Sequence, residues 1–272
     1  MTLALTNDEF DFISGLLKQR SGLALTPDKG YLIETRMGPI AKANGLADVR
    51  ELIAKLKSNP NAPIVYQVVE SMTTNESMFF RDTKPFDQLT KVILPDLKAK
   101  GRNSIRIWSA ACSTGQEAYS VAMTLKEEAV KYPGLNVEIY CTDLAEKVVE
   151  RARAGIYSQF EIQRGLPINL LMKYFAQRPN NNWEINDTIK NMCKFTTGNL
   201  LLPYNMLGKF DIIFCRNVLI YFDEKTKSDV LDRMGAIMNA PGYLYLGGSE
   251  TTHGLTKKFK VIEEHRGLFT LA

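Results

Sequence analysis

The segment that most constrains the fold is residues 210–222, which read FDIIFCRNVLIYF. Its first six residues are mostly apolar, the pattern of a strand buried on both faces, and the strand ends abruptly at Arg216 and Asn217. Such strands occur in parallel sheets covered by helices, and these sheets bind ligands beyond the carboxyl ends of their strands. A polar strand end can also simply reach solvent, so other segments must decide whether Arg216 and Asn217 are functional.

Strands alternate with helices from about residue 75 onward. The apolar runs and the helical periodicity predict strands at 105–111, 137–142, 210–215 and 243–246, and helices near 116–132, 147–154 and 224–239. Short apolar strands separated by helices of this length indicate an α/β fold with a mostly parallel, doubly wound sheet. From residue 260 onward the chain is expected to close the sheet with a hairpin.

The alternation is interrupted between residues 157 and 197. A short helix is expected at 170–174. Short strands are expected at 183–185 and 194–197, with polar sequence between them. The run Pro-Asn-Asn-Asn at residues 179–182 is typical of a tight turn. We interpret residues 157–197 as an insertion that carries a small antiparallel sheet.

Residues 1–73 show helical periodicity and no convincing strand. Thr6 and Glu9 have the spacing of a capping box at the start of the first helix. We therefore expect a helical domain over residues 1–73 and an α/β domain over residues 74–272. Residues 29–57 hold six basic and three acidic side chains, Arg36 and Lys42 among the basic ones, so one face is expected to suit an acidic partner. A solvated surface without a partner is the alternative.

Composition excludes several classes of function. The net charge of +4 is too small to indicate nucleic-acid binding by itself. The four cysteines form no Cys-x-x-Cys pair and there are two histidines, so neither a zinc site nor a disulfide framework is indicated, and buried thiols are expected. No apolar run is long enough to span a membrane, and no basic residue precedes the first apolar stretch, so we expect a cytoplasmic protein.

The turn after the first predicted strand, residues 110–117, reads AACSTGQE. Small residues that lead into a helix let a ligand approach the backbone closely at the helix N-terminus. The turn matches neither the dinucleotide fingerprint nor a phosphate loop, so a nucleoside is a better candidate than a pyrophosphate, and a purely structural turn is the alternative. Glu117 could meet a cationic ligand group or be a surface acid favoured by the helix dipole.

Asp143 ends the second predicted strand. In nucleotide-binding sheets an acid at this position accepts hydrogen bonds from ribose hydroxyls. Alone, Asp143 would also suit the role of a cap for the next helix. The small-residue turn follows the first predicted strand and Asp143 ends the second, as in nucleotide-binding sheets, so the two features together favour a ligand site.

Four motifs together resemble the CheR family, the chemotaxis receptor glutamate methyltransferases: residues 75–81 (NESMFFR), residues 108–120 (WSAACSTGQEAYS), Asp143, and residues 214–222 (FCRNVLIYF). The resemblance covers nearly the whole chain. It implies a Rossmann-like S-adenosylmethionine methyltransferase sheet with an N-terminal all-helical domain and a small antiparallel β insertion. It also implies S-adenosyl-L-methionine as cofactor, S-adenosyl-L-homocysteine as product, and the cytoplasmic methylation helices of methyl-accepting chemotaxis receptors as partner. Glutamate side chains there would become methyl esters, with no metal, nucleic acid or membrane insertion involved.

The resemblance also implies the site. Carried across residue by residue, it makes the following residues neighbours of the cofactor: Asn75, Ser77, Arg81, Glu117, Asp143, Asn199, Leu200, Arg216 and Asn217. Arg81 and Tyr221 are expected nearest the transfer as catalytic residues, although Tyr221 could instead be a packed aromatic cap. Ser77 stands where threonine is expected, and Gln116 where an acid is common. An ionised glutamate needs no general base to attack a sulfonium methyl group, which agrees with the absence of a catalytic triad pattern.

Two other classes of function compete with this prediction. A nucleic-acid methyltransferase is disfavoured because residues 217–220 lack a Pro-Pro element and no strongly basic stripe is present. A non-catalytic S-adenosylmethionine sensor is disfavoured because both Arg81 and Tyr221 are retained.

In some family members the insertion captures a pentapeptide tether at the receptor C-terminus by strand addition. Residues 175–194 look shorter than in tether-dependent members, so we expect no need of a tether, with inconsequential loop variation as the alternative.

Overall fold

The computed structural model describes residues 5–272 and divides into two compact units. One unit contains the chain up to Thr74 together with Tyr221–Thr226, and the other contains Asn75–Ile220 and Lys227–Ala272. The segment Tyr221–Thr226 therefore belongs to the helical unit, although it follows a strand of the α/β unit in the sequence.

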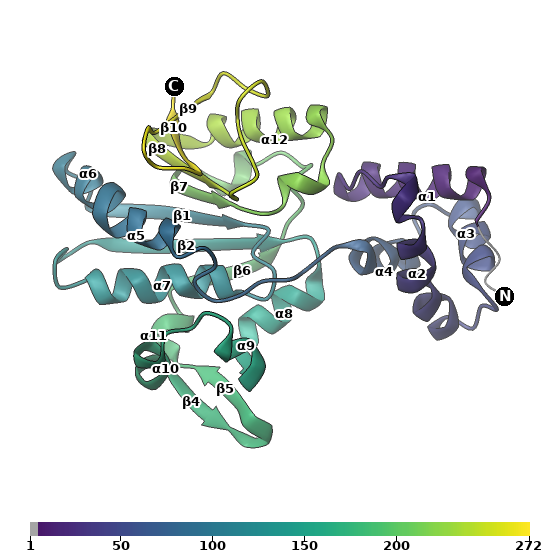
Figure 1. The fold of residues 1–272 in the computed structure, drawn as a ribbon, viewed down its shortest axis with the longest axis horizontal. Coiled ribbons are helices and arrows are strands. Elements are labelled where there is room, and N and C mark those ends of the chain that lie inside the picture. The colour runs from purple at the N-terminus through teal and green to yellow at the C-terminus, as the bar shows by residue number, and fades with distance from the viewer. Residues whose placement is uncertain (1–4) are drawn as a thin grey trace. The chain divides into compact units, whose positions relative to one another are not determined.

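Four helices build the first unit (Figure 1): α1 (Asn7–Ser21), α2 (Tyr31–Ala43), α3 (Val49–Ser58) and α4 (Pro63–Met72). Thr6 and Glu9 form the expected capping box, with Glu9 N–H donating to Thr6 Oγ1 at 3.3 Å and Thr6 N–H donating to Glu9 Oε2 at 2.8 Å. Side chains spaced three or four residues apart make the core between the helices, among them the fully buried Ile13, Leu17, Ile33, Met37, Leu52 and Val68.

Arg36 is not part of a free basic face. Its Nη1 donates to the carbonyls of Met72 and Thr73 at 2.7 and 3.0 Å, and its Nη2 donates to Thr74 Oγ1 at 3.2 Å. Arg36 thus satisfies carbonyls at the C-terminal end of α4, where helices leave acceptors unpaired. Lys42 is exposed and remains available to a partner.

The second unit is built on a seven-stranded sheet in the order β6-β2-β1-β7-β8-β10-β9. The first five strands of this order pair in parallel, and β8, β10 and β9 pair antiparallel, so the sheet is mostly parallel and closes with the predicted hairpin. The strands are β1 (Ser104–Ala110), β2 (Asn136–Asp143), β6 (Cys193–Thr197), β7 (Phe210–Cys215), β8 (Met238–Leu246), β9 (Phe259–Val261) and β10 (Leu268–Leu271).

Helices connect the strands of this unit (Figure 1). They are α5 (Lys84–Gln88), α6 (Leu94–Ala99), α7 (Gln116–Glu128), α8 (Glu146–Ala154), α9 (Gln159–Gln163), α10 (Ile168–Tyr174), α11 (Asp187–Lys190) and α12 (Glu224–Ala236). Two of them, α9 and α10, lie beside the small sheet of the insertion. In the part of the chain that is described, no helix combines the length and the apolar character that a membrane span requires.

One acidic residue, Asp211, is buried within β7, and its hydrogen bonds account for its burial. All six residues of β7 are buried, as the apolar pattern predicted, and Asp211 among them accepts hydrogen bonds from Arg106 N–H at 2.8 Å and Asn239 Nδ2 at 2.9 Å. Phe214 stacks on Tyr245 of β8 with ring centroids 4.4 Å apart. A carboxylate with two donors is tolerated in this core because its hydrogen bonds replace water.

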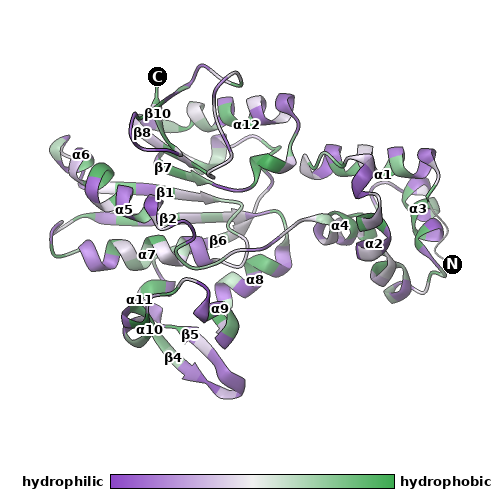
Figure 2. Ribbon diagram, in the orientation of Figure 1, coloured by the Kyte–Doolittle hydropathy of each residue, from purple (hydrophilic) through white to green (hydrophobic). Residues whose placement is uncertain are grey.

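The strands of the insertion differ from the expectation, because only one of the two expected strands, that at 183–185, belongs to the small sheet. The small antiparallel sheet contains β3 (Ile156–Ser158), β5 (Asn182–Ile185) and β4 (Phe175–Arg178), whereas residues 194–197 belong to β6 of the large sheet. β6 pairs in parallel with β2, and its alternation buries Cys193 and Phe195 on one face and exposes Lys194 on the other. The tip of the β4–β5 hairpin is hydrophilic in Figure 2, as the predicted polar turn requires.

Candidate functional site

The carboxyl ends of β1, β2 and β7 meet at one edge of the sheet because the three strands are parallel neighbours. The turn after β1 contacts the end of β2 directly. Ser113 N–H donates to Asp143 Oδ2 at 2.8 Å, and Cys112 N–H donates to the carbonyl of Thr142 at 2.9 Å. The other carboxylate oxygen, Asp143 Oδ1, accepts from Ala145 N–H at 3.1 Å. Asp143 therefore holds the turn after its own strand as well as the turn after β1.

The turn after β1 adopts an unusual backbone conformation. Ala111 and Ser113 have φ of 59° and 50°, in the left-handed region, and Gly115 has φ of 93°. A Cβ on residue 115 would lie 3.0 Å from Cβ of Ala152 and 3.2 Å from the hydroxyl of Tyr157, so this position requires glycine. Left-handed non-glycine residues persist where surrounding contacts determine the backbone, and they are found often at functional sites.

A second segment, which begins at Asn75, lies against this turn. Ser113 Oγ donates to the carbonyl of Asn75 at 2.6 Å, and Phe80 N–H donates to Ser120 Oγ in α7 at 2.9 Å. Phe79 is fully buried against Tyr157. Ser77 lies half-buried in the same segment.

Arg81 lies in the strained part of this segment. Phe80, Asp82 and Thr83 have φ of 48°, 68° and 44°, so Arg81 stands between left-handed residues. The side chain of Arg81 is half-buried, and its carbonyl accepts a hydrogen bond from Nη2 of Arg216 at 3.0 Å. The backbone of Arg81 is thereby tied to the end of β7.

Arg216 forms the centre of an ionic cluster. Its Nη1 lies 3.0 Å from Glu117 Oε2 and its Nη2 lies 2.6 Å from Asp82 Oδ2, while its side chain is 2% exposed. Glu117 Oε1 also accepts from Ser109 Oγ at 2.9 Å. Sequence reasoning predicted Glu117 and Arg216 as separate ligand groups, and it missed Asp82. The structure pairs Glu117 with Arg216 and leaves two carboxylates around one buried cation.

Charged groups of both signs lie at this edge. Asp82 and Glu117 pair with Arg216, and Asp143 accepts hydrogen bonds from the N–H groups of Ser113 and Ala145. The Nε of Arg216 is buried and has no hydrogen-bond partner in the structure. A sulfonium ion with an amino-acid end supplies positive charge and a carboxylate acceptor, so these residues fit S-adenosylmethionine chemically.

Asn199 and Leu200 follow β6 and reach the same edge. Gly198 N–H donates to the carbonyl of Asp143 at 2.8 Å. Asn199 Oδ1 accepts from Leu201 N–H at 2.9 Å, and the carbonyl of Leu200 accepts from Arg233 Nη2 at 3.0 Å. The loop that carries Asn199 and Leu200 is therefore fixed next to Asp143.

Asn217 continues from Arg216 with φ of 59°. Its N–H donates to Glu250 Oε2 at 2.8 Å. Sequence reasoning missed Glu250, because no local pattern shows which backbone groups a carboxylate in a loop will meet. Tyr221 lies in the helical unit, where it is half-buried and its carbonyl accepts from Ala24 N–H at 2.8 Å.

Two of the cysteines near this edge are held as buried thiols. Burial raises the pKa of Cys112 well above its usual value, and the carboxylates of Asp143 and Glu117 raise it further. Burial likewise raises the pKa of Cys215. All four thiols are buried and free, as expected, and among residues 5–272 no three His, Cys, Asp or Glu side chains gather as a metal site would need.

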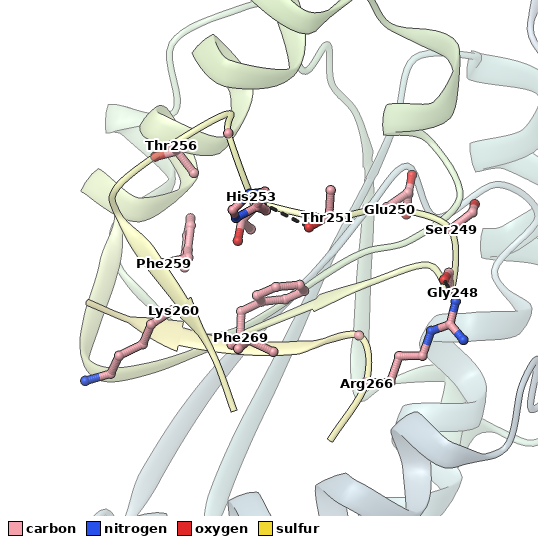
Figure 3. Close-up of a pocket in the computed structure, with 14 residues that line it drawn as sticks. Gly248, Ser249, Glu250, Thr251, His253, Thr256, Phe259, Lys260, Arg266 and Phe269 are labelled. Atoms are coloured by element: carbon pink, nitrogen blue, oxygen red, sulfur yellow. Dashed lines mark hydrogen bonds between the residues drawn. The ribbon is translucent and has the colours of Figure 1, made fainter. Parts of the chain in front are cut away.

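A separate cavity of about 650 Å³ lies beside the C-terminal hairpin and is drawn in Figure 3. Glu250, His253, Phe259 and Phe269 are among its lining residues, and Lys260 and Arg266 lie at opposite ends of the view. None of the predicted site residues lines it. The cavity is therefore not the predicted cofactor site, although Glu250 borders both regions.

Comparison with known proteins matched both parts of the chain. Residues 8–73 match the family model described as CheR methyltransferase, all-alpha domain, and residues 75–268 match CheR methyltransferase, SAM binding domain. A chemotaxis protein methyltransferase of Vibrio parahaemolyticus is 38% identical over 268 residues, which cover 98% of this chain and 97% of that protein. Chemotaxis protein methyltransferase 1 of Pseudomonas aeruginosa is 36% identical, with 98% of each chain covered. The chemotaxis protein methyltransferase of Escherichia coli is 34% identical, covering 94% of this chain and 89% of that protein.

Proposed function

The chain belongs to the CheR methyltransferase family, and from this premise we propose that it methylates glutamate side chains of bacterial chemoreceptors to methyl esters. It is an S-adenosylmethionine-dependent methyltransferase with a Rossmann-like domain. The observation that carries the proposal is the cluster of Arg216, Glu117 and Asp82 beside Asp143, at the strand ends where such sheets bind ligands.

The residues of this edge are proposed to hold the cofactor in place. Asp143 would accept hydrogen bonds from the ribose, since each carboxylate oxygen has more than one acceptor site. Asn75, Ser77, Asn199, Leu200 and Asn217 would line the nucleoside, and Glu117 and Arg216 would face the amino-acid end. When bound, S-adenosylmethionine supplies a methyl group on a positively charged sulfur, which passes to an ionised carboxylate and leaves S-adenosylhomocysteine.

Catalysis is proposed to rest on placement. The substrate glutamate, with an ordinary pKa of about 4.3, is ionised at neutral pH and needs no general base. Holding two reacting groups in line is worth several orders of magnitude in rate. Arg81 is proposed to orient a carboxylate through its planar guanidinium, and Tyr221 is proposed to position the reacting end through its hydroxyl. The role of Tyr221 is carried by the family resemblance alone.

The test of this function follows the methyl group. The protein is incubated with methyl-labelled S-adenosylmethionine and membranes that contain chemoreceptors, with excess S-adenosylhomocysteine as the inhibited control. We expect label on the receptor that mild base releases as methanol, because carboxyl esters are base-labile. Base-stable label, or label on nucleic acid, would refute the proposal. Tight cofactor binding without transfer to any receptor would instead favour a sensor.

We propose further that methylation does not require a C-terminal pentapeptide tether. In support, β4 and β5 have four residues each and are joined by the turn Pro179–Asn181, so the hairpin is short. Arg178 at its tip is already paired, since its Nε lies 2.6 Å from Glu184 Oε2, and Lys190 Nζ lies 2.9 Å from Glu184 Oε1. Trp183 donates to Gln159 Oε1 at 2.7 Å. These side chains pair with one another within the insertion.

Calorimetric titration with the tether peptide of a tether-bearing receptor tests this proposal. We expect no measurable heat, and equal methylation of receptors with and without the tether. The variant Arg178→Ala is the matched comparison, because it removes one of the two partners of Glu184 without removing a strand. Micromolar affinity in the unaltered protein that is lost on substitution of Trp183 would overturn the proposal.

A further inference from the structure

We propose that Glu250 is a positioning residue, which holds the turn after β7 in the conformation that methyl transfer requires; the inference rests on the proposed function. Glu250 lies in the loop after β8 and approaches the turn from another part of the chain. Its partners are main-chain N–H groups.

Four N–H groups converge on this carboxylate. Gly247 and Asn217 donate to Oε2 at 2.6 and 2.8 Å, and Val218 and Ile220 donate to Oε1 at 3.0 and 3.3 Å. Hydrogen bonds from N–H to a carboxylate are about twice as strong as those between neutral groups. Without the carboxylate, these N–H groups would lose their acceptor, and their partial positive charges would repel one another. The turn therefore depends on Glu250 for its conformation.

The backbone around Glu250 is shaped for this contact. Asn217 is left-handed, which turns the chain away from the sheet immediately after Arg216. A Cβ on residue 247 would lie 2.7 Å from Asn217 Nδ2 and 2.7 Å from Glu250 Oε2, so only glycine lets the ends of β7 and β8 approach this closely. Gly247 and Glu250 therefore act on the same turn.

The turn bears residues proposed for the cofactor site. Arg216 lies one residue before Asn217 and makes the contacts to Glu117, Asp82 and Arg81. A shift of the turn would move Arg216 and Asn217 together. On its other side Glu250 borders the cavity beside the C-terminal hairpin (Figure 3). The hydrogen bonds from Asn217, Val218 and Ile220 attach the loop after β8 to the turn after β7.

The experiment compares Glu250→Gln and Glu250→Asp with the unaltered protein. Glutamine keeps the shape but presents an amide NH₂ to N–H donors. Misplacement by about 1 Å can cost on the order of 100-fold in rate, and we expect a fall in kcat of that order. The Kd for S-adenosylhomocysteine should rise several-fold, and the Tm should change little. Aspartate keeps the charge and should restore part of kcat. Glu263→Gln, an exposed glutamate of the same C-terminal region, is the matched control.

Unchanged kcat and unchanged Kd in Glu250→Gln would overturn the proposal. Loss of the folded far-UV and near-UV circular dichroism would also overturn it, because Glu250 would then stabilise the whole unit rather than position the turn. If the unaltered protein transfers no methyl group, the proposed function fails separately, and the Kd for S-adenosylhomocysteine alone decides whether Glu250 supports the cofactor site. Gly247→Ala should reproduce the kinetic loss from the opposite side of the contact.

Discussion

At the scale of single residues, strain is concentrated around the proposed cofactor site. Phe80, Asp82, Ala111, Ser113 and Asn217 all have positive φ and all lie in segments that contact the strand ends. Each such residue costs on the order of 1–3 kcal/mol and persists only where its surroundings fix it. Here hydrogen bonds to Asp143, Arg216 and Glu250 do so. The conformations therefore indicate that these backbone segments are preorganised for a ligand.

Asp143→Ala should weaken the binding of S-adenosylhomocysteine by about 1.5–3 kcal/mol, since it removes a charged acceptor from the ribose. The structure adds a second expectation: the variant leaves the N–H groups of Ser113 and Ala145 without an acceptor, so the Tm should fall as well. Asp143→Asn keeps one acceptor and should lose less of both. Calorimetry and thermal unfolding measure the two effects, and unchanged affinity in Asp143→Ala would remove this residue from the site.

Tyr221→Phe should separate turnover from binding. If the hydroxyl positions the reacting end, its loss lowers kcat while the Kd for S-adenosylhomocysteine stays nearly constant. The phenyl ring keeps the packing, so the Tm should not change. Single-turnover methylation rates with saturating cofactor provide the measurement. Rates equal to those of the unaltered protein would make Tyr221 a packed aromatic residue.

At the scale of elements, the central strands of the sheet could be predicted from the sequence. The sheet to which the edge strand β6 belongs and the contacts between distant residues could not. β1, β2 and β7 are short strands rich in apolar residues and separated by helices, so the sequence alone indicated a parallel sheet. The polar residues at their ends indicated a ligand site near Asp143 and Arg216. β6 has five residues and lies at the sheet edge, where a short alternating pattern fits either sheet. The contacts of Glu250 and the pairing of Arg216 with Glu117 join residues distant in sequence, and no local spacing encodes them.

The segment Tyr221–Thr226 is tied to α1 by an ion pair. Asp223 Oδ2 lies 2.6 Å from Lys18 Nζ. The pKa of the Asp223 carboxyl is well below its usual range, chiefly through the hydrogen bond from Lys18 and then through Thr226. A depressed pKa adds stability that is present above the unfolded-state value of about 3.9 and is lost as the pH falls below it. Both side chains are partly exposed, so the gain is small.

Asp223→Asn should therefore lower the free energy of unfolding at pH 7, and the difference from the unaltered protein should shrink as the pH falls below about 4. Urea unfolding at a series of pH values measures this difference. Asp11→Asn removes an exposed carboxylate of α1 and serves as the control. A difference that stays constant down to low pH would contradict the assignment.

The exposed basic side chains of α2 and α3 are expected to attract the acidic methylation helices of a receptor. Lys42→Glu should raise KM for the receptor, most at low salt where screening is weakest, and leave kcat unchanged. Arg36 is unsuitable for this test because it supports the end of α4. Lys257→Glu makes the same change in net charge in the α/β unit. Equal KM values for the two variants at low salt would reject this docking surface.

At the scale of the whole molecule, the proposed cofactor site joins segments from five places in the chain, the farthest of them Asn75 and Asn217. A ligand that contacts several of them stabilises the α/β unit only when all are in place. S-adenosylhomocysteine at 100 times its Kd should add about 2.7 kcal/mol to the stability of this unit. For a chain of this size that corresponds to a rise of roughly 5–10 °C in Tm. A calorimetric scan without any shift would contradict a preorganised cofactor site.

Because Tyr221–Thr226 belongs to the helical unit, two separate stretches of the sequence must remain compatible as that unit evolves. Leu23 pairs with Phe222 through a β-bridge, so the helical unit is encoded by two separate stretches of the gene. A recombination event that exchanges the coding sequence up to residue 74 between relatives would bring a foreign Leu23 against the resident Phe222. Such chimeras should succeed only when the short downstream stretch is exchanged as well, and the two stretches should therefore change together across lineages.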